Sequence, residues 1–150
     1  NYDQKKIEQT IKKLSHFCKF QKKKLFIANN LKLAFKYNLD GIYIPSFNKN
    51  LNFKNLSLKN RFEMIGSAHN ITEIKIKEKQ GCNKIFLAPI FYNKKNKSFL
   101  EITKFSHLSQ TTKIDIIALG GINKKNLRRL RITKALGFAG ISYFKKKALS

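Results

Sequence analysis

The chain has 150 residues and carries 32 lysines and arginines against 8 aspartates and glutamates, a formal net charge of +24 at pH 7. This length accommodates one core, so we expect a single domain over residues 1–150, and a hydrophobic content of 42% excludes disorder throughout. Because no apolar run approaches the ~20 residues of a membrane span, and because Cys18 and Cys82 form neither a disulfide framework nor a metal-ligand pair, we expect a cytoplasmic protein without a membrane segment.

The predicted elements alternate between helices and short apolar runs. Residues 3–19 place Ile7, Ile11 and Leu14 at helical spacing, with Asp3 as the N-cap. Six runs of strand length follow, at 25–28, 41–45, 64–67, 84–91, 115–121 and 137–144. We expect the intervening helices over 31–38, 70–80, 101–110 and, capped by Asn123, from 123 to about 135, with an irregular connection over 46–61.

The six runs are continuously apolar and do not alternate between apolar and polar residues. Continuous apolar strands separated by helices are typical of a parallel sheet that is buried on both faces. Two α/β architectures fit this pattern: an open doubly wound sheet and a (β/α) TIM-type barrel. Since a complete barrel needs eight strands and roughly 200 or more residues, the barrel requires units that are missing from these 150 residues.

The charge alone is a weak indicator of function. A strongly basic chain usually suggests nucleic acid, because lysine and arginine neutralise phosphates. Here lysine dominates, arginine is scarce, and the basic residues are spread over every segment. Arginine is the better side chain for guanine edges and bidentate phosphate contacts. We therefore expect a solvated lysine surface that attracts small anions, and regard nucleic-acid binding as the less favoured alternative.

Two adjacent glycines, Gly120 and Gly121, stand where a predicted strand ends and a predicted helix begins. Such a pair lets a phosphate approach bare backbone N–H groups near a helix N-terminus, although a tight turn with positive φ would also require glycine. The segment Gly140-Ile141-Ser142 offers a second set of donors near the end of the next run. In (β/α) barrels the last two strand ends often form a phosphate site, so we predict one here.

Other strand ends carry side chains with two possible roles. The 69–70 turn favours helix capping, although His69 could act as an acid or base. Asn29 and Asn30 could bind a ligand or cap the next helix. The loop after the 84–91 run contains three lysines, Lys94, Lys95 and Lys97. They could bind a diphosphate or form a solvated surface, and the sequence fits both roles equally.

Four segments, in this order and spacing, resemble the thiamine phosphate synthase / TenI family: MIGSAHN at 64–70, GCNKIFLAPIF at 81–91, IIALGGIN at 116–123 and GFAGIS at 137–142. The resemblance covers about residues 3–144 and implies an eight-stranded (β/α) barrel whose first two strands, with the basic motif that grips the pyrimidine diphosphate, are absent here. It also implies a transferase of thiamine biosynthesis that joins a hydroxymethylpyrimidine diphosphate to a thiazole phosphate and releases pyrophosphate with the help of Mg²⁺. An exposed barrel seam would favour a homo-oligomer.

The resemblance also implies roles for individual residues. Asn29 matches a pyrimidine-binding position, and Ser67 matches a serine of the same catalytic pocket. Four residues match the thiazole phosphate site, namely Gly120, Gly121, Ile141 and Ser142. The catalytic lysine corresponds to Lys95 or Lys97, in a loop where Asn93-Lys94-Lys95-Asn96 replaces the Thr-Pro-Thr-Lys of the family.

Three further positions depart from the family pattern. The two metal-ligand positions, where aspartate is expected, hold Asn30 and Asn48, and loss of both carboxylates weakens a site for a hard cation such as Mg²⁺. TenI-type tautomerases carry a histidine where this chain has Pro89. The synthase branch therefore fits better than the tautomerase branch, with a catalytically inactive phosphate-binding barrel as the alternative.

Overall fold

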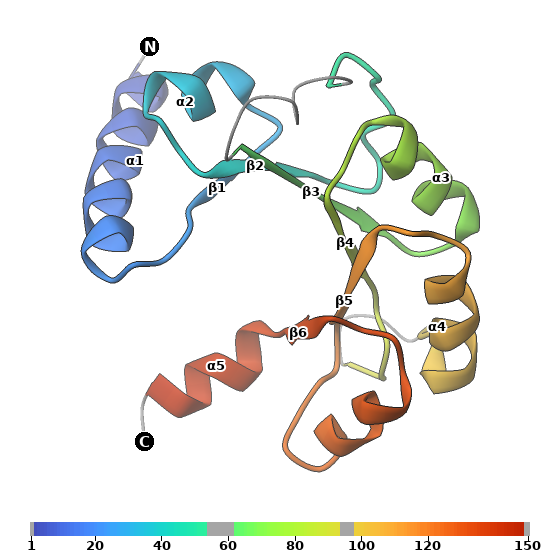
Figure 1. Cartoon of the computed structure of the whole chain (residues 1–150). Helices are drawn as coiled ribbons and strands as arrows, with labels where there is room; N and C mark the ends of the chain where they lie inside the picture. The colour runs from blue at the N-terminus through green and yellow to red at the C-terminus, as the bar shows by residue number, and fades with distance from the viewer. Residues whose placement is uncertain (1, 54–61, 94–97, 149–150) are drawn as a thin grey trace.

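The structure, a computed structural model, describes residues 2–53, 62–93 and 98–148. These residues form one sheet of six parallel strands in the order β1-β2-β3-β4-β5-β6. A doubly wound sheet reverses its strand order at a switch point, whereas here each strand pairs with the next one along the chain. This sequential order is that of a (β/α) barrel, and Figure 1 shows the sheet curving from β1 to β6.

The strands agree with the predicted runs, although most are shorter. Their bounds are Phe26–Ala28 (β1), Gly41–Ile44 (β2), Glu63–Ala68 (β3), Lys84–Leu87 (β4), Asp115–Leu119 (β5) and Gly137–Ala139 (β6). The register places Ile44, Gly66 and Ile85 side by side on the face toward the helices. Ile44 and Ile85 on this face are fully buried, as are Ile42, Met64 and Leu87.

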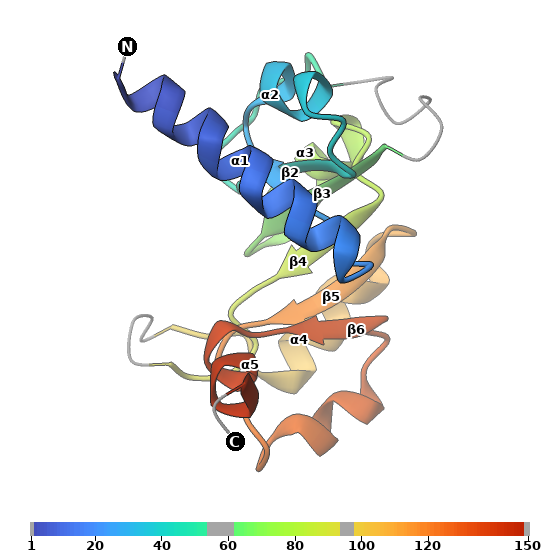
Figure 2. The same cartoon turned by 90° about the vertical axis from the view of Figure 1, so that its left-hand side faces the viewer.

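Along the chain, the described helices alternate with most of the strands. They are Tyr2–Phe20 (α1), Leu31–Lys36 (α2), Ile71–Lys79 (α3), Glu101–Gln110 (α4), the 3₁₀ helix Leu127–Ile132 (η2) and Ile141–Ala148 (α5). Figure 1 shows α3 and α4 on the outer side of the curve, with α1 near β1 and α5 directly after β6. In Figure 2, turned by 90°, α1 crosses obliquely in front of the sheet. None of the described helices is long and apolar enough to cross a membrane.

The structure corrects the prediction of an α-helix over 123–135. The segment forms a turn followed by the short 3₁₀ helix η2. The side-chain oxygen of Asn123 accepts hydrogen bonds from the backbone N–H groups of Lys125 (2.9 Å) and Asn126 (3.1 Å). In the other direction, the backbone N–H of Asn123 donates to Oδ1 of Asn126 (2.8 Å). Such local bonds compete with helix formation, so the two asparagines hold a closed turn where a helix was expected.

The last predicted strand, 137–144, is also corrected. Strand β6 ends at Ala139, and α5 begins at Ile141. The chain turns because Phe138 packs against the aromatic rings that follow it, with centroid distances of 5.1 Å to Tyr143 and 5.7 Å to Phe144. A continuing strand would carry these rings away from Phe138. At the other end of the chain, Asp3 lies in the first turn of α1 and not at its N-cap.

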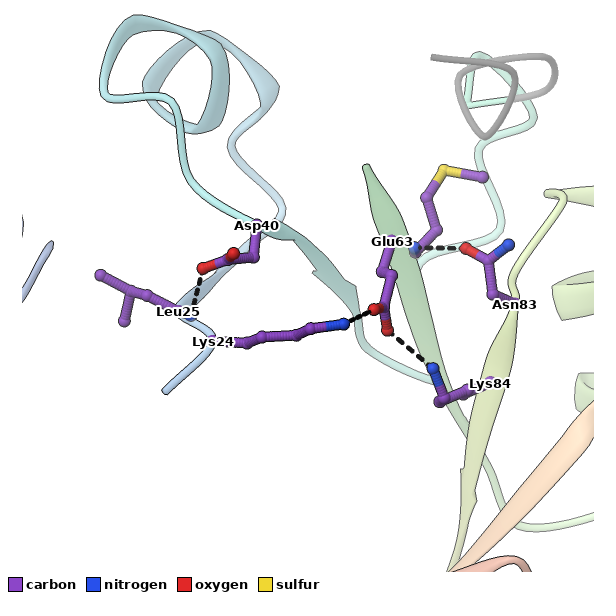
Figure 3. Close-up of polar contacts among 7 residues, drawn as sticks. Lys24, Leu25, Asp40, Glu63, Asn83 and Lys84 are labelled. Carbon is purple, nitrogen blue, oxygen red and sulfur yellow. Dashed lines mark hydrogen bonds and ion pairs between the residues drawn. The ribbon is translucent and has the colours of Figure 1, made fainter. Parts of the chain in front are cut away.

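The amino edge of the sheet is held by an acidic side chain between two lysines. Glu63 bonds Lys24 through Oε1 and Lys84 through Oε2, the latter at 2.7 Å, as Figure 3 shows. Nearby, Asp40 accepts the N–H of Leu25 at 2.8 Å (Figure 3). The hydrogen bonds from Lys24 and Lys84 lower the pKa of the Glu63 carboxyl. Lys24 and Lys84 thereby connect β3 to the segment before β1 and to β4.

Candidate functional site at the carboxyl edge of the sheet

The candidate site residues predicted from the sequence gather at one edge of the sheet. Because all six strands are parallel, their carboxyl ends lie at the same edge. Asn29 follows β1, Asn48 lies in the segment after β2, and Ser67 is near the end of β3. Gly120 and Gly121 follow β5, and Ile141 and Ser142 open α5 directly after β6. Lys94, Lys95 and Lys97 lie outside the described residues.

Gly120 and Gly121 both have positive φ, +95° and +70°. A Cβ on Gly121 would lie 2.4 Å from the carbonyl oxygen of Phe91, and a Cβ on Gly120 would lie 2.6 Å from Cβ of Pro89. The segment after β4 is held there by hydrogen bonds from Ile90 N–H to Leu119 O (2.9 Å) and from Phe91 N–H to Gly120 O (3.1 Å). The glycines are therefore required by backbone packing, a reason that the sequence prediction of phosphate access did not include.

The backbone donors of this turn remain available. Among the described residues, the N–H groups of Gly121 and Ile122 have no hydrogen-bond acceptor. The carbonyl of Gly121 accepts from Nδ2 of Asn126 at 2.8 Å, which fixes the turn. Unpaired N–H groups in a rigid turn are the donors that bind anions in many proteins.

The N-terminus of α5 lies beside this turn. Leu119 pairs with Ala139, so the residues that follow each of them emerge next to one another. Ile141 and Ser142 are exposed and occupy the first turn of α5, where backbone N–H groups have no partner within the helix. The two turns together offer backbone N–H donors of the kind that suits a phosphate. Ile141 and Ser142 are exposed, whereas Gly121 is half-buried and Ile122 is buried.

Ser67 is buried, and its hydroxyl accepts a 2.9 Å hydrogen bond from the hydroxyl of Tyr43. The Tyr43 ring lies 6.1 Å from that of Phe86, centroid to centroid. The sequence analysis did not identify the Tyr43 hydroxyl as a partner of Ser67. The signal was present in the parallel register, because Tyr43 pairs with Ile65 and therefore shares a face with Ser67 two residues on.

The prediction that the 69–70 turn caps the next helix is confirmed. Asn70 is the N-cap of α3, and its Oδ1 accepts the N–H of Glu73 at 3.0 Å. The Glu73 carboxylate in turn accepts a hydrogen bond from the backbone N–H of His69 at 2.7 Å. The His69 ring contacts the carbonyl of Ala88 through Nδ1 at 2.7 Å. His69 thus links the ends of β3 and β4.

The two positions where the resemblance implied Mg²⁺ ligands are engaged in other bonds. Oδ1 of Asn30 accepts the N–H of Leu33 at 3.0 Å and caps α2. Asn48 donates through Nδ2 to Oδ1 of Asn29 at 2.8 Å, and its own Oδ1 accepts the N–H of Asn50 at 2.9 Å. The described residues contain no group of three or more His, Cys, Asp or Glu side chains that could hold a metal ion. Asn30 and Asn48 therefore do not fit a Mg²⁺ site.

A further polar pair was missed by sequence reasoning. Lys77 and Gln80 of the α3 region are both fully buried, whereas the sequence suggested another surface lysine. Nζ of Lys77 and Nε2 of Gln80 both donate to the carbonyl of Asn48, at 2.8 Å and 2.9 Å. Burial lowers the pKa of Lys77 below its ordinary value. The spacing carried a signal, because Lys77 stands three residues after the buried Ile74 on the same helix face.

The fold and the edge define a class of protein: a parallel α/β barrel-type sheet with turns at the carboxyl ends of β5 and β6 that carry backbone N–H groups unpaired among the described residues. A family model described as thiamine monophosphate synthase matches residues 1–144. The chain belongs to this family.

Individual relatives agree with this assignment. The chain is 30% identical over 129 residues to a thiamine-phosphate synthase of Prochlorococcus marinus (strain SARG), covering 80% of this chain and 35% of that protein. It is 37% identical over 112 residues to the thiamine-phosphate synthase of Prochlorococcus marinus subsp. pastoris, covering 71% and 31%. The chain thus spans about a third of the length of these two relatives.

A solved structure supports the fold. The thiamine phosphate pyrophosphorylase from Pyrococcus furiosus superposes with a TM-score of 0.74 at 18% identity, covering 91% of this chain and 66% of that one. At this identity the similarity concerns the fold alone.

Proposed function

We propose that this chain carries the substrate-binding edge of a cytoplasmic thiamine phosphate synthase-type transferase. In that reaction a thiazole nitrogen forms a bond to the methylene carbon of a hydroxymethylpyrimidine diphosphate, the carbon–oxygen bond to the diphosphate breaks, and pyrophosphate leaves. Membership of the family supports this class of reaction. The observation that carries the proposal is the pair of turns after β5 and β6, whose N–H donors suit the phosphate of the thiazole substrate.

The residues of this chain have separate tasks in the proposal. The N–H groups of Gly121, Ile122 and the first turn of α5 hold the thiazole phosphate, with Gly120 and Ile141 shaping the two turns. Ser67, oriented by Tyr43, faces the pyrimidine pocket together with Asn29. Lys95 and Lys97 are the candidates to stabilise the departing pyrophosphate, since an ammonium group offsets its developing charge. No step is assigned to Mg²⁺, because Asn30 and Asn48 do not fit it.

A second candidate function is phosphate binding without catalysis. It is favoured by one observation: both amide side chains at the expected metal positions are occupied, Asn30 as a helix cap and Asn48 as a partner of Asn29. A chain of this kind would bind the phosphorylated substrates and release them unchanged.

Incubation of the purified protein with both substrates and Mg²⁺, followed by chromatographic detection of thiamine phosphate, separates the two candidates. Product formation that a Ser67→Ala variant reduces supports the transferase. Binding of thiazole phosphate without any product supports the non-catalytic barrel. Failure to bind either substrate contradicts both.

A further inference from the structure

Lys77 places a positive charge inside the protein, beneath the segment that follows β2. Its ammonium donates to three oxygens: Pro45 O at 2.8 Å, Asn48 O at 2.8 Å and Oε1 of Gln80 at 2.9 Å. An ammonium group has three donors, so all of them are satisfied. The three acceptors are uncharged, and none of the ion pairs among the described residues includes Lys77.

Gln80 adds a second attachment from the same helix region. Its Nε2 donates to Asn48 O at 2.9 Å and to Asn50 O at 2.8 Å. The carbonyl of Asn48 therefore receives two donors, one from each side chain. Buried polar groups with all partners satisfied define a single arrangement, because any alternative leaves a group unpaired.

The sheet leaves room for the lysine to reach this position. Gly66 of β3 faces α3, and a Cβ at Gly66 would lie 2.7 Å from Cδ and 2.9 Å from Cγ of Lys77. The same Cβ would lie 3.0 Å from Sγ of the buried Cys82. Because Gly66 has no side chain, the aliphatic part of Lys77 can pass over β3. Its ammonium group then reaches the segment after β2, which contains Pro45 and Asn48.

The loop fixed in this way carries the side chain that orients Asn29. Nδ2 of Asn48 donates to Oδ1 of Asn29 at 2.8 Å. Asn29 itself has positive φ (53°), and its N–H bonds Tyr43 O at 3.0 Å. Lys77 thus holds the backbone of Asn48, and the side-chain amide of Asn48 in turn bonds Asn29 at the carboxyl edge.

We propose that Lys77 and Gln80 are positioning residues for the candidate site, which act through Asn48 to fix the amide of Asn29 toward the pyrimidine diphosphate. This inference rests on the proposed function. The buried ammonium of Lys77 fixes the segment after β2 from inside the protein. The same segment contains Asn48, which, like Asn30, does not fit a divalent cation. Residues that orient the ligands of a metal site change affinity or activity by about 10- to 100-fold when they are mutated, and we expect an effect at the lower end of this range for Lys77 and Gln80.

The test uses side-chain amide NMR of the full chain. The variants are Lys77→Met and Gln80→Met, with Lys79→Met as the control, because Lys79 is an exposed lysine near the end of the same helix. The ¹⁵N-labelled side-chain amides of Asn29 and Asn48 are assigned and their solvent exchange is measured. In parallel, KM and kcat are measured for hydroxymethylpyrimidine diphosphate.

We expect Lys77→Met and Gln80→Met to move the Asn29 and Asn48 amide signals toward those of solvated asparagine and to accelerate their exchange. KM should rise by about tenfold with a smaller change in kcat, and Lys79→Met should change none of these. If Lys77→Met does not fold, Gln80→Met carries the test, because it leaves the ammonium in place.

Two results overturn the inference. Unchanged Asn48 signals in every one of the two variants, Lys77→Met and Gln80→Met, that folds show that the removed side chains do not hold the loop. Shifted signals with an unchanged KM show that the loop is held but that the site does not depend on it. If the unmodified chain forms no product, the transferase proposal fails and the NMR signals alone decide the inference.

Discussion

The hydroxyl of Tyr43 donates a 2.9 Å hydrogen bond to the buried Oγ of Ser67. The two residues come from neighbouring strands, β2 and β3. They lie on the opposite face of the sheet from Ile44 and Gly66, and Gly66 faces α3. Tyr43 therefore fixes the rotamer of Ser67 and satisfies one of its acceptor positions. If Ser67 binds the pyrimidine substrate as proposed, its orientation depends on Tyr43, a residue that the sequence motif does not include.

Tyr43→Phe should weaken binding of the pyrimidine substrate. The change removes one hydrogen bond, typically worth about 1 kcal/mol, and so lowers affinity by about fivefold. Isothermal titration measures this directly. Tyr92→Phe is the matched control, because Tyr92 is 60% exposed and retains its ring against Phe99. Equal affinities of the Tyr43→Phe variant and the unmodified chain would show that Ser67 does not need this partner.

Gly121→Ala should destabilise the fold by about 2 kcal/mol or more, because its Cβ would lie 2.4 Å from Phe91 O at a positive φ. Gly137→Ala is the control, since a Cβ there has no neighbour within 4 Å, and it should change stability by less than ~0.5 kcal/mol. Urea unfolding compares the two. Similar unfolding midpoints for both variants would contradict the close packing of the glycine turn against the segment after β4.

The ion pairs of Glu63 predict a pH dependence of stability. Its pKa is lowered from 4.5 in the folded protein by hydrogen bonds from Lys24 and Lys84. The stabilisation is thus complete above pH 4.5 and is lost as the pH falls through the folded-state pKa. Glu63→Gln should cost about 1 kcal/mol near neutral pH, and the difference should shrink in acid. Urea unfolding of both proteins at several pH values measures it. A difference that stays constant into strong acid would exclude this role of the carboxylate.

Self-association of the purified chain is expected to depend on salt. The apolar side chains Ile7, Leu14, Phe17 and Phe20 of α1 are exposed, and β1 and β6 are the outer strands of the described sheet. The net charge of +24 opposes contact between two copies, and salt screens this repulsion. Sedimentation velocity should therefore show more dimer or higher oligomer as salt is raised. A monomer at every salt concentration would contradict the expectation.

The strands and their order could be predicted because each has a local signature. All six apolar runs contain strands, and their alternation with helices predicted the parallel sheet but fitted both a doubly wound sheet and a barrel. The sequential order of the barrel was implied by the resemblance to the family and is observed in the structure. The turn after β5 was harder, since Asn123 is equally suitable as a helix cap and as the centre of a turn. The bond between Asn126 and Gly121 O decides in favour of the turn, and local propensity does not reveal it.

The candidate site shows the same limit. Motifs located Ser67, Asn29 and the glycine pair at one edge, which the structure confirms as a shared location. The partners of these residues were not predictable, because Tyr43 and Lys77 have the types expected of core and surface positions. Their roles depend on contacts between segments far apart in the chain: Tyr43 with Ser67, and Lys77 with the carbonyl of Asn48.

We expect phosphate to bind between the turn after β5 and the start of α5. A titration of the ¹⁵N-labelled chain with inorganic phosphate, followed by backbone amide NMR, tests it most directly and leaves Gly121 unchanged. We predict saturable shifts of the amide signals of Gly121, Ile122, Ile141 and Ser142, which persist at moderate salt because backbone donors and not surface lysines make the contacts. Shifts that map instead to lysine-rich surface segments and vanish with added salt would contradict the claim.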